Sequence, residues 1–308
     1  MALKIKRKGK NSFFKFRRQQ ELFAWSFVII PLAMMIISWV FINGQSVVMA
    51  FQHEYEGWGF QNFKDLYADF TDPHKSNNLL QTVLNTLTYF VCQEFIGIPL
   101  SLFVSYFIYK RISGYKAFRV IFYLPSIIPA MVFVTGFQQI VAPDGVFERI
   151  VSVLGVELPR YGLLQTEYTA RTTLIVYQII TTAAGNILFY SAMSRVPPEL
   201  IEAGKIDGLT LLKEFFYIDF PLILPTFSMT LLLDCASMLN CSPPILLFGN
   251  PPGTGSVNFW FFNEVYVGGV MGISKYGRMS AMGLTFTMFN LPIVLFVRWL
   301  AGRVDVSY

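Results

Sequence analysis

Long apolar stretches without any charged residue constrain most strongly how this 308-residue chain can fold. Each one approaches or exceeds the about 20 apolar residues that a helix needs to cross a bilayer. The strands of a transmembrane β-barrel would instead alternate apolar and polar residues over about ten positions. The sequence therefore predicts membrane-spanning helices. Four stretches fit this description: Leu22–Ile42, Val120–Ala142, Thr172–Ser194 and Met279–Val297.

Two further apolar stretches contain one acidic residue each. Glu94 interrupts Leu79–Tyr109, and Asp234 interrupts Phe220–Cys241. Only 14% of the residues are charged and 54% are hydrophobic, so the chain has too little charge to cover a water-facing surface. We expect an all-α membrane protein in which six transmembrane helices form one domain over residues 22–305.

The distribution of lysine and arginine predicts which ends face the cytoplasm, because basic residues resist translocation. The tail of residues 1–21, the connections after the second and fourth predicted helices, and the C-terminal end together hold 17 of the 24 basic residues. Both termini are therefore predicted to be cytoplasmic. The first apolar stretch exceeds the about 7–15 residues of a signal-peptide core, so we expect it to remain as an anchor.

Residue types that carry enzyme or metal chemistry are scarce. The three cysteines, Cys92, Cys235 and Cys241, lie in or beside apolar stretches without CxxC spacing, and both histidines lie in the first predicted external loop. No catalytic or metal-ligating set is therefore predicted. The sequence also lacks a GxxxxGK[ST] phosphate loop, so we expect no cofactor on this chain and expect ATP, if it drives transport, to be held by another polypeptide.

The predicted connections between the helices are unequal in length. Three external loops, residues 43–78, 143–171 and 242–278, are long. Together they are expected to offer a docking surface, although their proline and glycine content also suits ordinary irregular loops.

The cytoplasmic connection over residues 195–219 has the most specific pattern. The pair Pro197–Pro198 predicts a helix start, acidic residues follow in the first turn where the helix dipole favours them, and Gly208 predicts the end of this helix. A second apolar face follows, so we expect a helix-turn-helix unit with small residues that allow close approach of a partner. Periodicity alone also allows an amphipathic helix on the membrane surface.

One segment of this connection resembles the EAA loop of the inner-membrane permease subunits of binding-protein-dependent ABC importers. It reads Glu202-Ala203-Gly204-x-x-Asp207-Gly208, with Phe215 and Pro221 downstream. Other segments resemble the carbohydrate-type permeases, such as those for maltose and glycerol-3-phosphate, in the same order. These segments are Trp58–Phe63, Asn85-Thr86-Leu87, Phe118–Pro125, Pro143-Asp144-Gly145, Tyr276-Gly277 and Ser280-Ala281.

Two positions depart from the family pattern. Gly204 replaces the second alanine of the EAA core, and Leu209 replaces the alanine that follows Asp-Gly. The first change keeps close packing possible, whereas Leu209 adds bulk at the expected contact and would affect which ATPase fits. The resemblance implies that a coupling helix enters a groove on the ATPase. The implied coupling residues are Glu202, Ala203, Gly204, Asp207, Gly208 and Phe215.

The resemblance also implies a complex and a mechanism. Two cytoplasmic ATPase subunits would hold ATP and Mg²⁺, and a second permease subunit, which the resemblance favours as a paralogue, would complete the pore. An external binding protein would deliver a sugar or oligosaccharide, which alternating access would move into the cytoplasm. The implied location is the cytoplasmic (inner) membrane of a prokaryote, and this chain would have no enzyme activity of its own.

Acids within predicted helices are candidates for the solute pathway. A charge at the bilayer centre costs about 2.5–3.5 kcal/mol on insertion scales, so such a residue is expected to face protein or water. Asp234 is a stronger candidate than Glu94, because the resemblance places the fourth, fifth and sixth helices along the pathway. Each candidate also suits an ordinary contact between helices. The candidates are Asp234, Asn186, Tyr190, Met238, Asn240 and Asn290.

Other functions stay open at this level. A permease of the same family for a phosphorylated polyol, a peptide or a polyamine would have the same pattern. Inverted repeats or several paired intramembrane charges would favour a stand-alone secondary transporter or channel, and the sequence shows neither. An HExxH or GxSxG motif or a paired catalytic Asp would favour a membrane-embedded enzyme, and none of these occurs.

Overall fold

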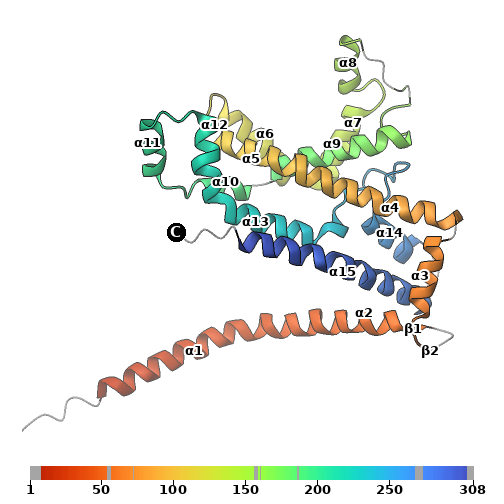
Figure 1. Ribbon diagram of the computed structural model, residues 1–308, viewed down its shortest axis with the longest axis horizontal. Helices are drawn as coiled ribbons and strands as arrows, with labels where there is room; N and C mark the ends of the chain where they lie inside the picture. The colour runs from red at the N-terminus through yellow and green to blue at the C-terminus, as the bar shows by residue number, and fades with distance from the viewer. Residues whose placement is uncertain are drawn as a thin grey trace, which may run out of the picture. The chain divides into compact units, whose positions relative to one another are not determined.

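The computed structural model consists almost entirely of helices (Figure 1). It describes residues 8–53, 57–71, 73–155, 159, 161–185, 187–267 and 273–303. Six helical stretches in this part of the chain are long and apolar enough to cross a membrane, which agrees with the predicted number. They are Phe23–Phe51, Leu79–Tyr109, Ala130–Val153, Glu167–Met193, Leu211–Ala236 and Tyr276–Gly302.

The chain folds into two compact units. The first unit comprises the described parts of Met1–Leu66 and Met271–Leu284, and the second comprises the described parts of Tyr67–Val270 and Thr285–Tyr308. Two helices contribute residues to both units. These helices are α3 (Gln61–Thr71) and α15 (Ile273–Gly302).

The first unit contains a long apolar helical stretch followed by a small hairpin. Large apolar side chains along the stretch are exposed, for example Phe23, Ile37 and Trp39, which suits contact with lipid. The stretch consists of α1 (Lys8–Met35), a π-helical segment (Ile36–Phe41) and α2 (Ile42–Phe51), and β1 (Gln52–His53) then pairs antiparallel with β2 (Gly57–Trp58).

Asn62 fixes the backbone of the first unit. Its Nδ2 atom lies within hydrogen-bonding distance of three backbone carbonyl oxygens, at 3.3 Å from Met49, 3.0 Å from Ala50 and 2.9 Å from Gln52. Gly277 lies against the same group, because a Cβ atom there would come within 2.7 Å of Asn62 Nδ2. Two of the segments that resemble permeases therefore meet at one structural contact.

The second unit holds the remaining helices. Several of them are interrupted by π-helical or 3₁₀ segments rather than by loops. In chain order they are α4 (Pro73–Cys92), a π-helical segment (Gln93–Gly97), α5 (Ile98–Tyr109), α6 (Tyr115–Ile127), α7 (Ala130–Val141), α8 (Val146–Val153), α9 (Glu167–Gly185), α10 (Ile187–Met193), α11 (Pro198–Ile206), α12 (Leu211–Glu214), a π-helical segment (Phe215–Asp219), α13 (Phe220–Ala236), a 3₁₀ turn (Met238–Asn240), α14 (Val257–Phe262) and a π-helical segment (Asn263–Val267).

Within the second unit, α4 and α5 form one long rod with α9 and α10 packed along it (Figure 1). One core cluster joins α5, α10 and α13 through Leu102, Phe189 and Ile223. A second cluster joins α7 and α9 to the irregular segment after α13 through Val134, Leu174 and Ile245. α11 stands at the end of the unit where α5 ends, away from the second cluster (Figure 1).

The structure corrects several predicted boundaries. The stretch Val120–Ala142 is not one helix, because Ile128 and Pro129 adopt extended backbone between α6 and α7. Helical structure continues through residues 43–51, which were predicted to belong to an external loop, and most described residues of the rest of that loop are also helical. The fifth span is Leu211–Ala236 and not Phe220–Cys241, since the π-helical segment continues it at the start and Ser237 ends it.

Candidate functional site: coupling hairpin and central pocket

The predicted cytoplasmic helix-turn-helix is present, and we call residues 197–219 the coupling hairpin. α11 begins at Pro198, as the proline pair predicts, because proline fixes a helical φ and lacks the N–H that a first turn leaves unpaired. Gly208 adopts φ +75°, a left-handed conformation that side chains disfavour, and it ends the helix as predicted. α12 then starts at Leu211.

The predicted coupling residues divide into two groups. Glu202, Ala203, Asp207 and Gly208 are exposed, and these are the members that a partner is able to contact directly. Gly204 and Phe215 are buried within the chain itself. Four of the six predicted coupling residues thus lie on the outside of the hairpin and two lie inside it.

Gly204 and Leu209, the two departures from the family pattern, lie against each other. A Cβ atom on Gly204 would come within 2.7 Å of Ile218 Cδ1 and 3.0 Å of Leu209 Cδ1. The side chain of Leu209 thus packs against α11 inside the hairpin. The sequence had predicted instead that Leu209 adds bulk at the ATPase contact. The absent methyl group and the added leucine side chain compensate each other in volume.

Phe215 fixes the base of the coupling hairpin to α5. Its ring stacks on Phe103 at 5.7 Å between centroids and meets Tyr106 edge-on at 4.9 Å. The hydroxyl of Tyr106 also donates to the backbone oxygen of Leu211, at 2.6 Å. Movement of the hairpin is therefore coupled mechanically to the end of α5.

A buried ion cluster lies at the same junction. Lys110, directly after α5, places Nζ 2.5 Å from Glu214 Oε1 and 3.1 Å from Asp219 Oδ2. Both carboxylates are almost fully buried. Burial by itself lowers the pKa of Lys110, but the hydrogen bond that Lys110 donates to Glu214 and the charge of Asp219 outweigh it and hold the pKa above the usual lysine value. Two acids facing one cation thus lock α5 to α12 and to the start of α13.

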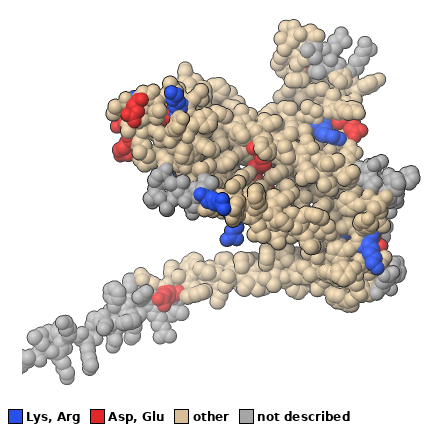
Figure 2. Space-filling view, viewed as in Figure 1, with Lys and Arg blue, Asp and Glu red and all other residues tan. Residues whose placement is uncertain are grey.

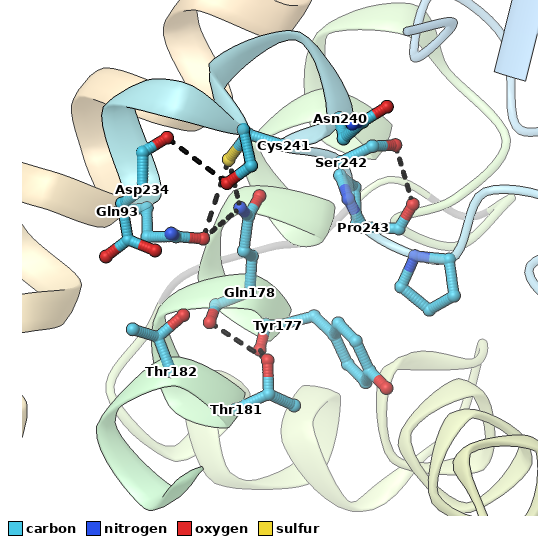
Figure 3. Close-up of a pocket in the computed structure, with 12 residues that line it drawn as sticks. Gln93, Tyr177, Gln178, Thr181, Thr182, Asp234, Asn240, Cys241, Ser242 and Pro243 are labelled. Carbon is cyan, nitrogen blue, oxygen red and sulfur yellow. Dashed lines mark hydrogen bonds between the residues drawn. The ribbon is translucent and has the colours of Figure 1, made fainter. Parts of the chain in front are cut away.

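The second candidate site is a cavity of about 310 Å³ inside the second unit (Figure 3). We call it the central pocket. Its walls come from the middle of the second and fourth spans, from the end of α13 and from the irregular segment that follows. Non-helical backbone at membrane depth is tolerated where it lines a cavity, so this segment fits the position. Twelve residues line it: Gln93, Tyr177, Gln178, Thr181, Thr182, Asp234, Ser237, Asn240, Cys241, Ser242, Pro243 and Pro244.

A π-helical bulge places Gln93 in the wall of the pocket. Such single-turn bulges insert a residue into an α-helix and occur frequently at functional sites. The bulge ends at Gly97, where an added Cβ atom would lie 3.1 Å from Thr182 Cγ2. Glycine at this position therefore lets the second span approach α9 closely, which brings Gln93 next to Gln178.

Amide groups dominate the hydrogen bonding in the pocket (Figure 3). Gln178 Nε2 donates to Gln93 Oε1 at 2.8 Å and to Cys241 Sγ at 3.1 Å. Gln178 Oε1 is buried and has no donor within the described chain. Buried amide oxygens normally have a donor, so this one is a candidate for binding a ligand or an ordered water molecule.

The predicted pathway residues fall in different places. Asp234 and Asn240 line the central pocket. Met238 is buried next to it, and Asn290 Nδ2 donates to the backbone oxygen of Ala236 at 3.2 Å while Asn290 Oδ1 has no donor among the described residues. Tyr190 lies under the guanidinium of Arg119, at 5.8 Å from its ring centroid. The remaining candidate, Asn186, lies outside the described residues.

The sequence did not predict Gln93 or Gln178 as site residues. Each is a single amide inside an apolar stretch, and an isolated amide usually signals a hydrogen bond between helices. For Gln93, one signal was available in the sequence: it precedes Glu94, the only charged residue of its span. No group of three or more His, Cys, Asp or Glu residues suited to a metal occurs among the described residues.

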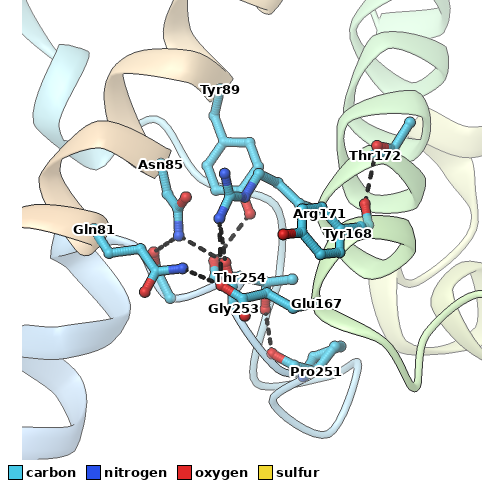
Figure 4. A network of polar contacts seen from close by, with 11 residues as sticks. Gln81, Asn85, Tyr89, Glu167, Tyr168, Arg171, Thr172, Pro251, Gly253 and Thr254 are labelled. Carbon is cyan, nitrogen blue, oxygen red and sulfur yellow. Dashed lines mark hydrogen bonds and ion pairs between the residues drawn. The ribbon is translucent and has the colours of Figure 1, made fainter. Parts of the chain in front are cut away.

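The long loop after α13 is anchored to α4 (Figure 4). Asn85 Nδ2 donates to the backbone oxygens of Gly253 and Gly255, both at 2.9 Å. The Tyr89 hydroxyl donates to the backbone oxygen of Thr254 at 2.9 Å. This explains the Asn85-Thr86-Leu87 segment structurally, because Asn85 holds the loop that continues from the pocket wall.

Charged side chains of the second unit gather away from the pocket. Figure 2 shows acidic and basic groups over α11 and its neighbours, and another pair near the start of α9. Between these groups, Figure 2 shows a small acidic patch and, near the C-terminal end of α15, basic groups, and the rest of the surface between them is free of charge. This distribution suits two polar ends separated by a membrane-spanning middle.

Comparison with known protein families identifies the chain. The family described as binding-protein-dependent transport system inner membrane component matches residues 97–306, which is more than half of the chain. The chain belongs to this family. The match includes the coupling hairpin and every lining residue of the central pocket except Gln93.

Individual relatives of this inner membrane component agree with the family match. The probable ABC transporter permease protein YesP of Bacillus subtilis (strain 168) is 25% identical over 63% of this chain and 61% of that protein. The multiple sugar-binding transport system permease protein MsmF of Streptococcus mutans serotype c is 24% identical over 90% of this chain and 95% of that protein. A crystal structure of a bacterial ABC transporter involved in import of the acidic polysaccharide alginate has the same fold, with 21% identity, a TM-score of 0.74, and 96% of this chain and 100% of that chain covered.

Family membership settles several predictions. The chain is a multi-pass inner membrane component of a binding-protein-dependent ABC importer. A permease subunit of this kind binds no cofactor itself, and separate ATPase subunits hydrolyse ATP. The permease prediction made from the EAA-like segment is thus confirmed, and the alternatives of a stand-alone transporter and of a membrane-embedded enzyme are set aside.

Proposed function

We propose that this inner membrane component imports a sugar or oligosaccharide by alternating access. The observation that carries the proposal is that one family match includes both an exposed coupling helix and a polar pocket lined by amides, hydroxyls and one carboxylate. Such groups suit the hydroxyls of a saccharide. The relative MsmF is named for multiple sugars, and the structural neighbour transports alginate, which supports a carbohydrate as solute.

In the proposed complex, both termini and α11 face the cytoplasm. Two ATPase subunits bind the two coupling helices of this chain and of a second, paralogous permease. Glu202, Ala203, Asp207 and Gly208 form the contact face on this chain, because they are the exposed members of the EAA-like segment. An external binding protein docks on the outer loops and delivers the solute.

Closure of the ATPase subunits would move the coupling hairpin. Phe215 and the cluster of Lys110, Glu214 and Asp219 join that hairpin to α5 and α13. α13 carries Asp234 at its other end, and the rod that contains α5 carries Gln93. A push at α11 is therefore transmitted to two walls of the central pocket. A partner can shift this equilibrium only if it binds one state better than the other.

A bulky residue at Gly208 tests the coupling role. No atom lies within 4 Å of an added Cβ atom at Gly208, so Gly208→Trp meets no clash within the chain and projects into the proposed ATPase groove. The substitution also strains the backbone at φ +75°, and a control variant must share this strain. We expect normal membrane insertion but loss of both solute uptake and the ATPase stimulation caused by the loaded binding protein.

Gly208→Ala is the matched control. It imposes the same backbone strain at φ +75° without the bulk of tryptophan, since an added Cβ atom there meets nothing within 4 Å. The two variants are compared in proteoliposomes that contain the complete importer, at equal amounts of inserted protein. Full ATPase stimulation by Gly208→Trp would contradict the proposed coupling face, and uptake of only a non-sugar solute by the native importer would contradict the proposed solute class.

A further inference from the structure

The central pocket is rich in hydrogen-bond acceptors that have no donor of their own. The Asp234 carboxylate is half-buried and makes no hydrogen bond or ion pair with any residue that the structure describes. Gln178 is 93% buried, yet its Oε1 atom also has no donor in that part of the chain. A buried acceptor without a donor is costly, so the pocket favours a molecule that supplies N–H or O–H groups.

A second carboxylate lies close to the pocket. Glu94 follows Gln93 in the same π-helical bulge, and Asp234 is near enough to Glu94 for its charge to act on it. None of the twelve lining residues is basic. The coupling hairpin shows the opposite arrangement, because its two buried acids face Lys110.

We propose that the central pocket selects uncharged, hydroxyl-rich saccharides and rejects acidic ones, with Asp234 as the residue that determines this specificity. The inference rests on the proposed function as a sugar importer and names the class of sugar. A neutral saccharide supplies hydroxyl donors to Asp234 and to Gln178 Oε1. A uronate brings a carboxylate into a site where no lining cation offsets its repulsion from Asp234.

The neutral solute proposed for this chain differs from the solute of its structural neighbour. That transporter imports an acidic polysaccharide, and the shared fold at 21% identity says nothing about the charge of the solute. The argument about charge rests on the pocket lining of this chain. The expected solute is therefore a neutral sugar, even though the neighbour moves a negatively charged one.

Charged thiol reagents measure the electrostatics of the pocket without any knowledge of the solute. Asn240 is exposed and lines the pocket, so Asn240→Cys offers a reporter thiol once Cys92, Cys235 and Cys241 are replaced by serine or alanine. The complete importer in lipid nanodiscs is treated with cationic and anionic methanethiosulfonate reagents, and each rate is divided by the rate of the same reagent with free cysteine.

We expect the normalised rate to favour the cationic reagent about tenfold, as charge interactions at partly buried positions do. Asp234→Asn in the same background should lower this preference at least about threefold. Equal normalised rates, or a preference for the anionic reagent, would overturn the proposal. An uncharged methanethiosulfonate reagent reports access, and its failure to react would contradict an open pocket at Asn240.

Transport experiments complete the test. A native importer should take up neutral oligosaccharides of glucose, galactose or arabinose and leave the corresponding oligogalacturonates outside, and Asp234→Asn should weaken this discrimination at least about fivefold. Efficient uptake of an oligogalacturonate by the native chain would overturn the charge proposal while leaving the sugar-importer function intact. Absence of any saccharide uptake together with a strong cationic preference would refute the proposed function but not the charge of the pocket.

Discussion

The coupling hairpin and the central pocket place carboxylates in opposite surroundings. Glu214 and Asp219 share Lys110, which lies within 3.1 Å of each. Asp234 has no cation among the lining residues of the pocket. The first arrangement gives both acids a cation inside the chain and joins three elements, and it leaves Asp219 Oδ1 without a donor among the described residues. The second has no cation and leaves acceptors open to a ligand.

This difference separates polar residues that hold the fold from polar residues that recognise a solute. Removal of one member of a completed cluster leaves the others uncompensated, and the fold becomes less stable. Removal of an acceptor that lacks a partner relieves a cost to the fold, and only binding is lost. Stability and transport should therefore respond oppositely to mutation in the two regions.

The largest effect is expected for Lys110→Met. Glu214 and Asp219 would remain buried without a cation, which costs about 3–5 kcal/mol of unfolding free energy. The measurement is the unfolding midpoint of the purified complex in detergent. Adding Glu214→Gln and Asp219→Asn to Lys110→Met should recover most of the loss, because no charge then remains. Equal stability of native protein and Lys110→Met would show that the cluster does not hold the hairpin.

A smaller effect, mainly on transport, is expected for Gln178→Met. Methionine has a similar length and removes the buried Oε1 atom that lacks a donor, but it also removes the Nε2 donor to Gln93 Oε1. Solute uptake should fall about tenfold, which corresponds to about 1.4 kcal/mol of lost binding, while stability should fall by no more than the about 0.5–1.5 kcal/mol that one hydrogen bond contributes. If instead the midpoint falls further and uptake per folded complex is unchanged, Gln178 belongs to the fold and not to the site.

The smallest effect concerns Gly204 and Leu209. Gly204→Ala places a methyl group 2.7 Å from Ile218 Cδ1, a flexible side-chain end, so we expect a loss of about 1 kcal/mol. Leu209→Ala in the same chain should restore most of it, since it removes the second neighbour of that methyl group. Thermal unfolding of the two single variants and the double variant gives the interaction energy directly, and simple additivity would contradict the compensation.

Much of the fold follows from the sequence because lipid imposes one strong rule, an apolar helix of sufficient length. Four charge-free stretches and two with a single acid predicted six spans, and Pro197–Pro198 with Gly208 predicted α11. The break at Pro129 was missed, because a proline inside an apolar stretch is compatible with either a kinked helix or a break.

The candidate sites were only partly predictable. Asp234 was found because a single acid in an apolar span is costly, whereas Gln93 and Gln178 carry no such signal. Their proximity depends on a π-helical bulge and on the close approach at Gly97, which are tertiary features. The inward position of Gly204 was also hidden, since a small residue suits packing inside the chain and contact with a partner equally well.

The most direct test of the contrast between the two regions is Asp234→Asn, measured for stability and for transport in the same preparation. The substitution keeps the shape of the side chain and removes its negative charge. We predict that the complex with Asp234→Asn has an unfolding midpoint equal to or higher than that of the native complex. Its discrimination between neutral and acidic oligosaccharides should be weaker. A lower midpoint with unchanged uptake and unchanged discrimination would contradict this prediction.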